Sequence, residues 1–110
     1  MRLAVPLADG VLCAHFGHCQ QFVILDTQDG SITAMNHHTP PPHEPGALPR
    51  WVGELGVNVV IAGGMGRRAV DLFNERGIEV MVGAPSAPPE KLVADYLAGT
   101  LRVGHNRCDH

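Results

Sequence analysis

The chain has 110 residues, of which 17% are charged and 45% hydrophobic, and its formal net charge is −3 with the histidines neutral. This length fits a single domain with its own core, and no basic stripe is present, which argues against nucleic acid as a partner. No apolar run approaches the ~20 residues of a membrane helix. Because Pro6, Asp9 and Gly10 interrupt any signal-peptide pattern, we expect a cytoplasmic protein with no membrane partner.

The first half of the chain predicts antiparallel strands. Residues 2–7 and 22–26 are short apolar strand candidates, and residues 31–36 form the returning strand of a hairpin. The turn of this hairpin is Asp29-Gly30, because glycine tolerates the positive φ that such turns need. Residues 40–49 hold five of the nine prolines and therefore predict an exposed loop.

The second half predicts parallel strands joined by helices. Apolar residues three and four positions apart indicate helices over 47–55, 67–76 and 90–97. The apolar runs 57–62 and 78–82 are typical of short buried strands. The predicted order is therefore β-β-β-α-β-α-β-α, which is an α/β domain with a mixed sheet and helices on its faces.

A short loop concentrates side chains that bind soft metals. The candidate ligands there are Cys13, His15, His18 and Cys19. Thiolate and imidazole favour copper, zinc, iron or iron–sulfur centres, and an odd total of three cysteines argues against a disulfide framework. The spacing matches no standard zinc or redox motif. Gly17 allows the loop to wrap around a ligand, whereas a buried structural Cys13 and a core Phe16 remain the alternatives.

A glycine-rich turn, Gly63-Gly64-Met65-Gly66, connects the strand 57–62 to the helix 67–76. Backbone N–H groups in such a turn and at a helix N-terminus can bind an anion, and Arg67 and Arg68 add positive charge. Neither the P-loop nor the GxGxxG pattern is present, and a turn needed only for geometry is the alternative. If the strands before this turn and before the cysteine loop are parallel neighbours, both loops face one pocket.

Two further groups of histidine and cysteine occur. Residues 99–110 predict a loosely structured tail that either frays or closes the pocket with Cys108 and His110. His37, His38 and His43 flank the proline-rich loop. Adjacent histidines on a strand point to opposite faces, so at most one of the first two would face the pocket.

In order and spacing, several segments together resemble the dinitrogenase iron–molybdenum cofactor biosynthesis family, which includes the nitrogenase X and Y accessory proteins and the C-terminal domain of the nitrogenase B protein. The segments are residues 1–6, 15–17, 59–66, 72–80, 96–99 and 108–110. The resemblance implies a ribonuclease H-like fold, with a mixed five-stranded sheet and helices on both faces. It does not imply nuclease activity, because fold alone does not determine function.

The resemblance further implies a non-catalytic protein that binds or carries a metal–sulfur cofactor or its precursor. The chain is most similar to the small stand-alone members, one of which carries a mixed molybdenum–copper sulfide cluster. A molybdenum–copper sulfide cluster or an iron–molybdenum-type cluster is therefore the expected cargo. His15 matches the family's His-Phe-Gly histidine, and Cys108 and His110 match a C-terminal Cys/His cluster.

The resulting hypothesis is a single domain over residues 1–110 that holds an anionic cluster. The predicted cluster-binding residues are His15, Phe16, Gly17, His18, Gly63, Gly64, Met65, Gly66 and Arg67, and the predicted metal ligands are Cys13, His15, Cys19, Cys108 and His110. The alternatives are a mononuclear zinc or iron site, a phosphate-ester hydrolase, and a regulatory module with a protein partner such as a P-loop ATPase. We expect a monomer or a weak dimer.

Overall fold

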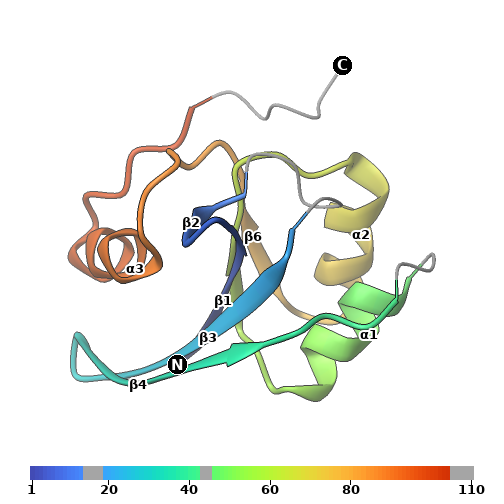
Figure 1. Ribbon diagram of the computed structural model, residues 1–110, viewed down its shortest axis with the longest axis horizontal. Coiled ribbons are helices and arrows are strands. Elements are labelled where there is room, and N and C mark those ends of the chain that lie inside the picture. Colours follow the sequence, from blue (N-terminus) through green and yellow to red (C-terminus); the bar gives the residue numbers. More distant parts are fainter. Residues whose placement is uncertain (14–18, 43–45, 105–110) are drawn as a thin grey trace.

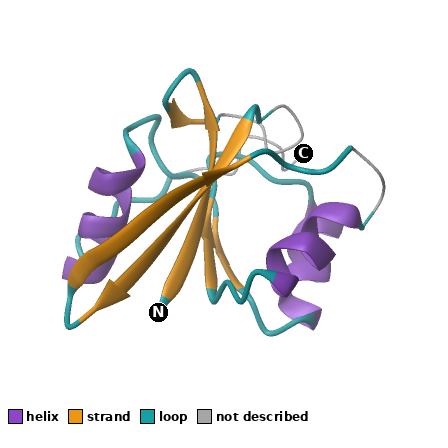
Figure 2. Ribbon diagram, turned by 60° about the horizontal axis from the view of Figure 1, so that its bottom comes forward, coloured by secondary structure: helices purple, strands orange, loops and turns teal. Residues whose placement is uncertain are grey.

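The computed structural model describes residues 1–13, 19–42 and 46–104 and shows one mixed sheet with helices on both of its faces (Figures 1 and 2). The strands are β1 (Arg2–Ala8), β2 (Val11–Leu12), β3 (Gln21–Gln28), β4 (Ser31–His38), β5 (Val59–Ile61) and β6 (Glu79–Met81). The helices are α1 (Ala47–Glu54), α2 (Arg67–Glu75) and α3 (Pro89–Ala98). None of the helices in these ranges is long and apolar enough to cross a membrane.

The sheet has the order β4-β3-β1-β5-β6, with β2 paired to β1 outside this path. β3 is antiparallel to both β1 and β4, whereas β1, β5 and β6 are parallel. The mixed α/β fold is therefore confirmed, as are the antiparallel first half and the parallel second half. β1 and β5 are direct neighbours, so the condition for one shared pocket is met.

The predicted strand count was wrong by one, because β2 was not predicted. β2 has only two residues, too few to show an alternating pattern, and it pairs Leu12 with Leu7 and Val11 with Ala8 of β1. The turn between them is Asp9-Gly10, whose φ angles of 55° and 81° suit a tight two-residue hairpin. The observed order is therefore β-β-β-β-α-β-α-β-α.

Two core clusters fill the space between the sheet and its helices. α1 and α2 cover one face and α3 the other, so Figure 2 shows the sheet between two helices on the right and one on the left. Side chains alternate along β1, so that Ala4 enters the cluster under α1 and α2, whereas Leu3 and Val5 enter the cluster under α3. The first of these is called the α1–α2 core below.

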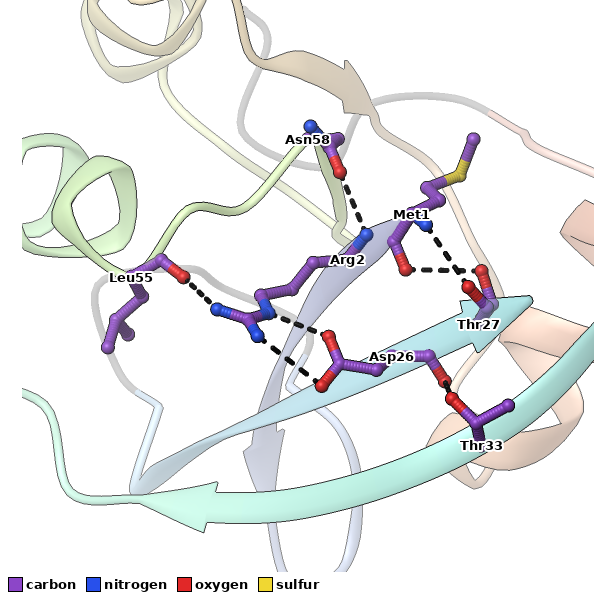
Figure 3. A network of polar contacts seen from close by, with 7 residues as sticks. All are labelled: Met1, Arg2, Asp26, Thr27, Thr33, Leu55 and Asn58. Carbon is purple, nitrogen blue, oxygen red and sulfur yellow. Dashed lines mark hydrogen bonds and ion pairs between the residues drawn. The ribbon is translucent and has the colours of Figure 1, made fainter.

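Arg2 connects β1 to β3 and to the end of α1 (Figure 3). Its Nε donates to Asp26 Oδ1 at 2.6 Å, and its Nη1 donates to the Leu55 carbonyl oxygen at 2.5 Å. The backbone N–H of Arg2 donates to Asn58 Oδ1 at 2.8 Å. The hydrogen bond between the Arg2 and Asp26 side chains lowers the pKa of Asp26 and raises the pKa of Arg2. This network lies at the amino end of β1, away from the candidate site.

Candidate functional site

The candidate site lies where β1, β5 and β6 end. These three strands are parallel, so their carboxyl ends meet at one edge of the sheet, at the top of Figure 1. Open α/β sheets bind ligands in the crevice outside this edge. We call it the carboxyl edge.

Cys13 lies at the carboxyl edge, beyond the end of β5. Near the carboxyl end of β1, Leu7 pairs with Gln21 of β3 on one side and with Leu12 of β2 on the other. β2 therefore lies on the side of β1 where β5 also lies. Cys13 follows β2 directly, and its N–H donates to the Pro6 carbonyl oxygen at 2.9 Å. Its side chain is buried, with 4% exposed.

Cys19 marks the return of the same loop to the sheet. The next residue, Gln20, donates its N–H to the Leu7 carbonyl oxygen at 2.8 Å, and its side-chain oxygen accepts from the Asp9 N–H at 3.2 Å. Both ends of the cysteine loop are therefore fixed to consecutive residues of β1, Pro6 and Leu7. Cys19 is partly buried and packs against the α1–α2 core.

The Cys19 thiol is protonated at neutral pH. Burial raises its pKa to about 11, and a negative charge on Cys13 adds to the rise. A thiol with this pKa is a poor nucleophile, because the thiolate is the reactive form. Metal binding at Cys19 would therefore have to displace a proton.

The glycine-rich turn leaves the end of β5 at the same edge. Gly63 accepts a hydrogen bond from the Gly83 N–H at 2.9 Å, which joins this turn to the loop after β6. Gly63 and Gly64 are buried, and Met65 is fully buried within the α1–α2 core. Met65 therefore offers no accessible surface to a ligand in this structure.

Gly66 and the N-terminus of α2 form the exposed part of this turn. Gly66 is the N-cap of α2, with φ −62° and ψ 150°, and no side chain caps the helix. These angles are accessible to any residue, and a Cβ at Gly66 would meet nothing within 4 Å. Neither backbone conformation nor packing therefore requires glycine here. Arg67 and Arg68, both exposed, follow at the positive end of the helix dipole.

The chain after α3 returns to the carboxyl edge. The Gly104 N–H donates to the Gly83 carbonyl oxygen at 2.7 Å. Gly83 has φ +80°, and a Cβ there would overlap the Gly104 backbone, so only glycine allows this approach. No local sequence signal predicts this contact, because the two glycines are far apart in the chain and match no motif.

The structure therefore places Cys13, Cys19 and the turn from Gly63 to Arg67 at the same edge of the sheet. Of the remaining predicted residues, His15, Phe16, Gly17, His18, Cys108 and His110 lie outside the described residues, as does His43. Within the described ranges, no three side chains of His, Cys, Asp or Glu are grouped as metal ligands.

The two histidines of β4 lie elsewhere. His38 pairs with Phe22 in the sheet and faces α1, and its ring centroid is 6.2 Å from that of Trp51. His37 pairs with Val23, whose side chain belongs to the other core cluster, so the two histidines alternate between faces.

Two grooves adjoin α1. A groove of ≈ 330 Å³ includes Arg2, Asp26 and His38, and another of ≈ 210 Å³ includes Trp51 and Arg50. Neither is lined by the glycine-rich turn.

The fold is a mixed α/β domain with a candidate site built from loops at the ends of its parallel strands. The chain belongs to the dinitrogenase iron–molybdenum cofactor family, whose model matches residues 1–99. This membership connects the protein with metal-cluster cofactors.

Three relatives illustrate the similarity. The chain is 30% identical to MJ0580, a protein of Methanocaldococcus jannaschii, over 92% of this chain and 89% of that one. The crystal structure of PH0822 matches with a TM-score of 0.87 and 29% identity, over 94% of both chains. The apo form of the orange protein from Desulfovibrio gigas matches with a TM-score of 0.77 and 22% identity, over 96% of this chain and 93% of that one.

Proposed function

We propose that this protein binds and carries an anionic metal–sulfur cluster that contains molybdenum, and that it does so without catalysing a reaction. The cluster is cargo in this proposal, either a molybdenum–copper sulfide cluster or an iron–molybdenum cofactor precursor. The observation that carries the proposal is the meeting of two soft thiols and an uncapped helix N-terminus at one edge of the sheet.

The exposed backbone N–H groups at the start of α2 supply hydrogen bonds to the anionic sulfides. The first N–H groups of a helix have no partner within the helix, and the helix dipole favours negative charge there. Arg67 and Arg68 add two full positive charges beside these donors. This part of the site selects for negative charge rather than for a particular metal.

The open position at Gly66 fits a bulky ligand. A Cβ at this position would have no described protein atom within 4 Å, and the open space lies next to the first turn of the helix. Glycine at such a position leaves the backbone N–H groups accessible to a ligand larger than a single ion.

Cys13 and Cys19 supply the thiol chemistry at the same edge. Thiolate prefers Cu(I) among the common cellular metals, so a copper-containing cluster gives these residues a direct role. A cluster held only through its sulfides would instead need no bond to either thiol. His15 and His18, which lie between these two cysteines in the sequence, are also proposed to contact the cluster.

The C-terminal cysteine and histidine are proposed to contribute from the tail. Gly104 is held beside Gly83 at the carboxyl edge, and Cys108 follows four residues later in the sequence. Four residues span at most about 14 Å. This reach is compatible with a role of Cys108 and His110 at the same site.

Reconstitution under anaerobic conditions tests the proposal. The purified chain is mixed with tetrathiomolybdate, with and without Cu(I), then desalted and analysed for molybdenum, copper and visible absorption. We expect molybdenum to remain bound, with an absorption spectrum that differs from free tetrathiomolybdate. Absence of retained molybdenum in both mixtures would overturn the proposal.

A matched pair of variants locates the binding. Arg67→Gln removes a positive charge at the start of α2, whereas Arg76→Gln removes one at the exposed C-cap of the same helix. We expect only Arg67→Gln to weaken molybdenum retention. Equal loss in both variants would indicate general attraction by net charge. Stoichiometric zinc or iron without sulfide in freshly isolated protein would favour the mononuclear alternative.

A further inference from the structure

β4 forms a long open edge of the sheet. It is the terminal strand in the sheet order and pairs only with β3 among the described strands. Six of its eight residues are exposed. In an antiparallel pair, alternate residues of each strand point their N–H and C=O groups away from the neighbour, so β4 presents a row of such groups.

Between Ala34 and His38 this edge lacks the usual protection against strand pairing. Natural edges are kept apart by charged side chains, proline, short length or bulges. β4 reads Ser-Ile-Thr-Ala-Met-Asn-His-His, with no Lys, Arg, Asp, Glu or Pro. Asp26 of β3 pairs with Ala34 and Thr27 pairs with Ile32, so Thr33 is an extra residue that bulges β4 near the turn, and the stretch from Ala34 to His38 continues in regular register.

The opposite edge is built differently. β6 has three residues, begins with the exposed Glu79, and is followed by Gly83, whose carbonyl accepts from Gly104. Short length and charge therefore protect β6 but not β4. Of the two described edge strands, β4 alone is therefore open to pairing with another strand.

We propose that β4 pairs antiparallel with β4 of a second copy of this chain, about a two-fold axis, so that one sheet continues through both copies. Two-fold pairing places the strand opposite itself, and like charges directly opposite one another are destabilising. A strand without charged side chains avoids this repulsion, and equal lengths allow it to pair along its regular part. This self-complementarity selects a second copy as the occupant.

Met35 lies in the regular part of β4, one residue from Asn36 at its centre. It is the exposed large apolar side chain of β4, with 41% of its surface accessible, and it pairs with Leu25 of β3. Near the two-fold axis it would pack close to its own copy and lose that exposure. An interface centred on one strand is smaller than the ~1,200 Å² lower bound of standard interfaces, so the dimer is weak.

The proposed dimer leaves the carboxyl edge accessible and does not rest on cluster binding. β3 separates β4 from β1, and the glycine-rich turn follows β5 on the far side of β1. Each copy would therefore keep its own site.

Sedimentation velocity over micromolar to millimolar protein concentrations tests the pairing. We expect the wild type to move from monomer toward dimer as concentration rises. Met35→Lys and Met35→Glu, each alone, should remain monomeric, because the like charges of the two copies lie close together on either side of the axis, and an equimolar mixture of the two should associate again. Val103→Lys, which changes another exposed apolar residue, should associate as the wild type does.

A wild type that stays monomeric throughout this range would overturn the proposal. Single variants that dimerise like the wild type would overturn it as well, as would a mixture that fails to associate. Amide chemical shifts of the wild type provide a readout without substitution, and concentration-dependent shifts should be confined to β4 and its immediate neighbours. Concentration-dependent shifts centred elsewhere would place self-association on another surface and contradict the pairing.

Discussion

Gly66→Asp separates the stability of the fold from the binding of the cluster. Gly66 occupies the N-cap of α2 in an extended conformation, where no side chain caps the helix and the first turn has no acidic residue. Aspartate is among the preferred N-cap residues, and a carboxylate at this end interacts favourably with the helix dipole. The same carboxylate would occupy the N–H groups that we assign to the cluster.

The substitution should stabilise the fold and weaken cluster binding. The cap adds a few tenths of a kcal/mol over glycine, the dipole interaction adds about 0.3–1, and the loss of glycine flexibility in the unfolded chain adds about 0.4–1. We therefore expect the free energy of unfolding to rise by about 1–2 kcal/mol. Hydrogen bonds to charged groups contribute about 1.5–3 kcal/mol, so a loss near 2 kcal/mol weakens binding about 30-fold.

Urea denaturation measures the first effect, and titration of the apoprotein with tetrathiomolybdate and Cu(I), followed by absorption, measures the second. Pro88→Asp is the matched control, because Pro88 is the N-cap of α3 with φ −59° and ψ 146°, also without a side-chain cap. It adds the same charge on the other face of the sheet and should leave binding unchanged.

Wild-type affinity in Gly66→Asp would refute the assignment of the α2 N-terminus to the cluster. A variant that is less stable than the wild type would refute the capping argument. Equal weakening by Gly66→Asp and Pro88→Asp would show that net charge, rather than position, decides the affinity.

Three further predictions concern other parts of the molecule. At pH 8 iodoacetamide should modify Cys19 about 10-fold more slowly than a thiol of pKa 9.0, because its pKa of about 11 lowers the thiolate fraction by more than the higher nucleophilicity of its thiolate restores, and peptide mapping that finds equal rates would contradict this. Since Arg2 lowers the pKa of Asp26, the ion pair stabilises the fold above the ordinary carboxyl pKa of about 3.9 and loses this effect as the pH falls through the folded-state pKa. Asp26→Asn should therefore be less stable than the wild type at pH 7, with a difference that narrows in acid; denaturant titrations showing a constant difference would exclude this cause. Gly83→Ala should lower the free energy of unfolding by about 1–2 kcal/mol and expose the residue 104 amide to hydrogen exchange, because φ at Gly83 is +80° and a Cβ there overlaps Gly104. Gly104→Ala is the control and should resemble the wild type, because its Cβ would lie 3.7 Å from the Gly83 carbonyl oxygen. Similar exchange of this amide in both variants would contradict the contact.

Most of the fold follows from local sequence patterns. The apolar spacing predicted a helix over 67–76 and α2 spans Arg67–Glu75, and the Asp29-Gly30 turn correctly joined β3 to β4. The missed strand β2 follows an equivalent Asp-Gly turn, but two residues are too few to show a period. Strand boundaries also differ from the predicted ones, because backbone pairing decides where a strand begins and ends. The apolar run 57–62, for example, contains a β5 of only Val59–Ile61.

The candidate site was less predictable because its arrangement depends on contacts distant in sequence. The residue types identified both loops, but only the position of β2 on the β5 side of β1 brings Cys13 to the glycine-rich turn. Met65 was grouped with the cluster-binding residues by its place in that turn, whereas tertiary packing buries it completely in the α1–α2 core. The contact of Gly83 with Gly104 likewise has no local signal.

Mapping of backbone amide shifts in ¹⁵N-labelled protein tests the central claim most directly. Tetrathiomolybdate and Cu(I) are added anaerobically, and the perturbed residues are assigned. We predict that the shifts concentrate at Cys13, Cys19 and the turn from Gly63 to Arg68, with β4 and the middle of α3 unchanged. Shifts centred on the grooves beside α1, or no shifts at saturating ligand, would contradict a cluster site at the carboxyl edge.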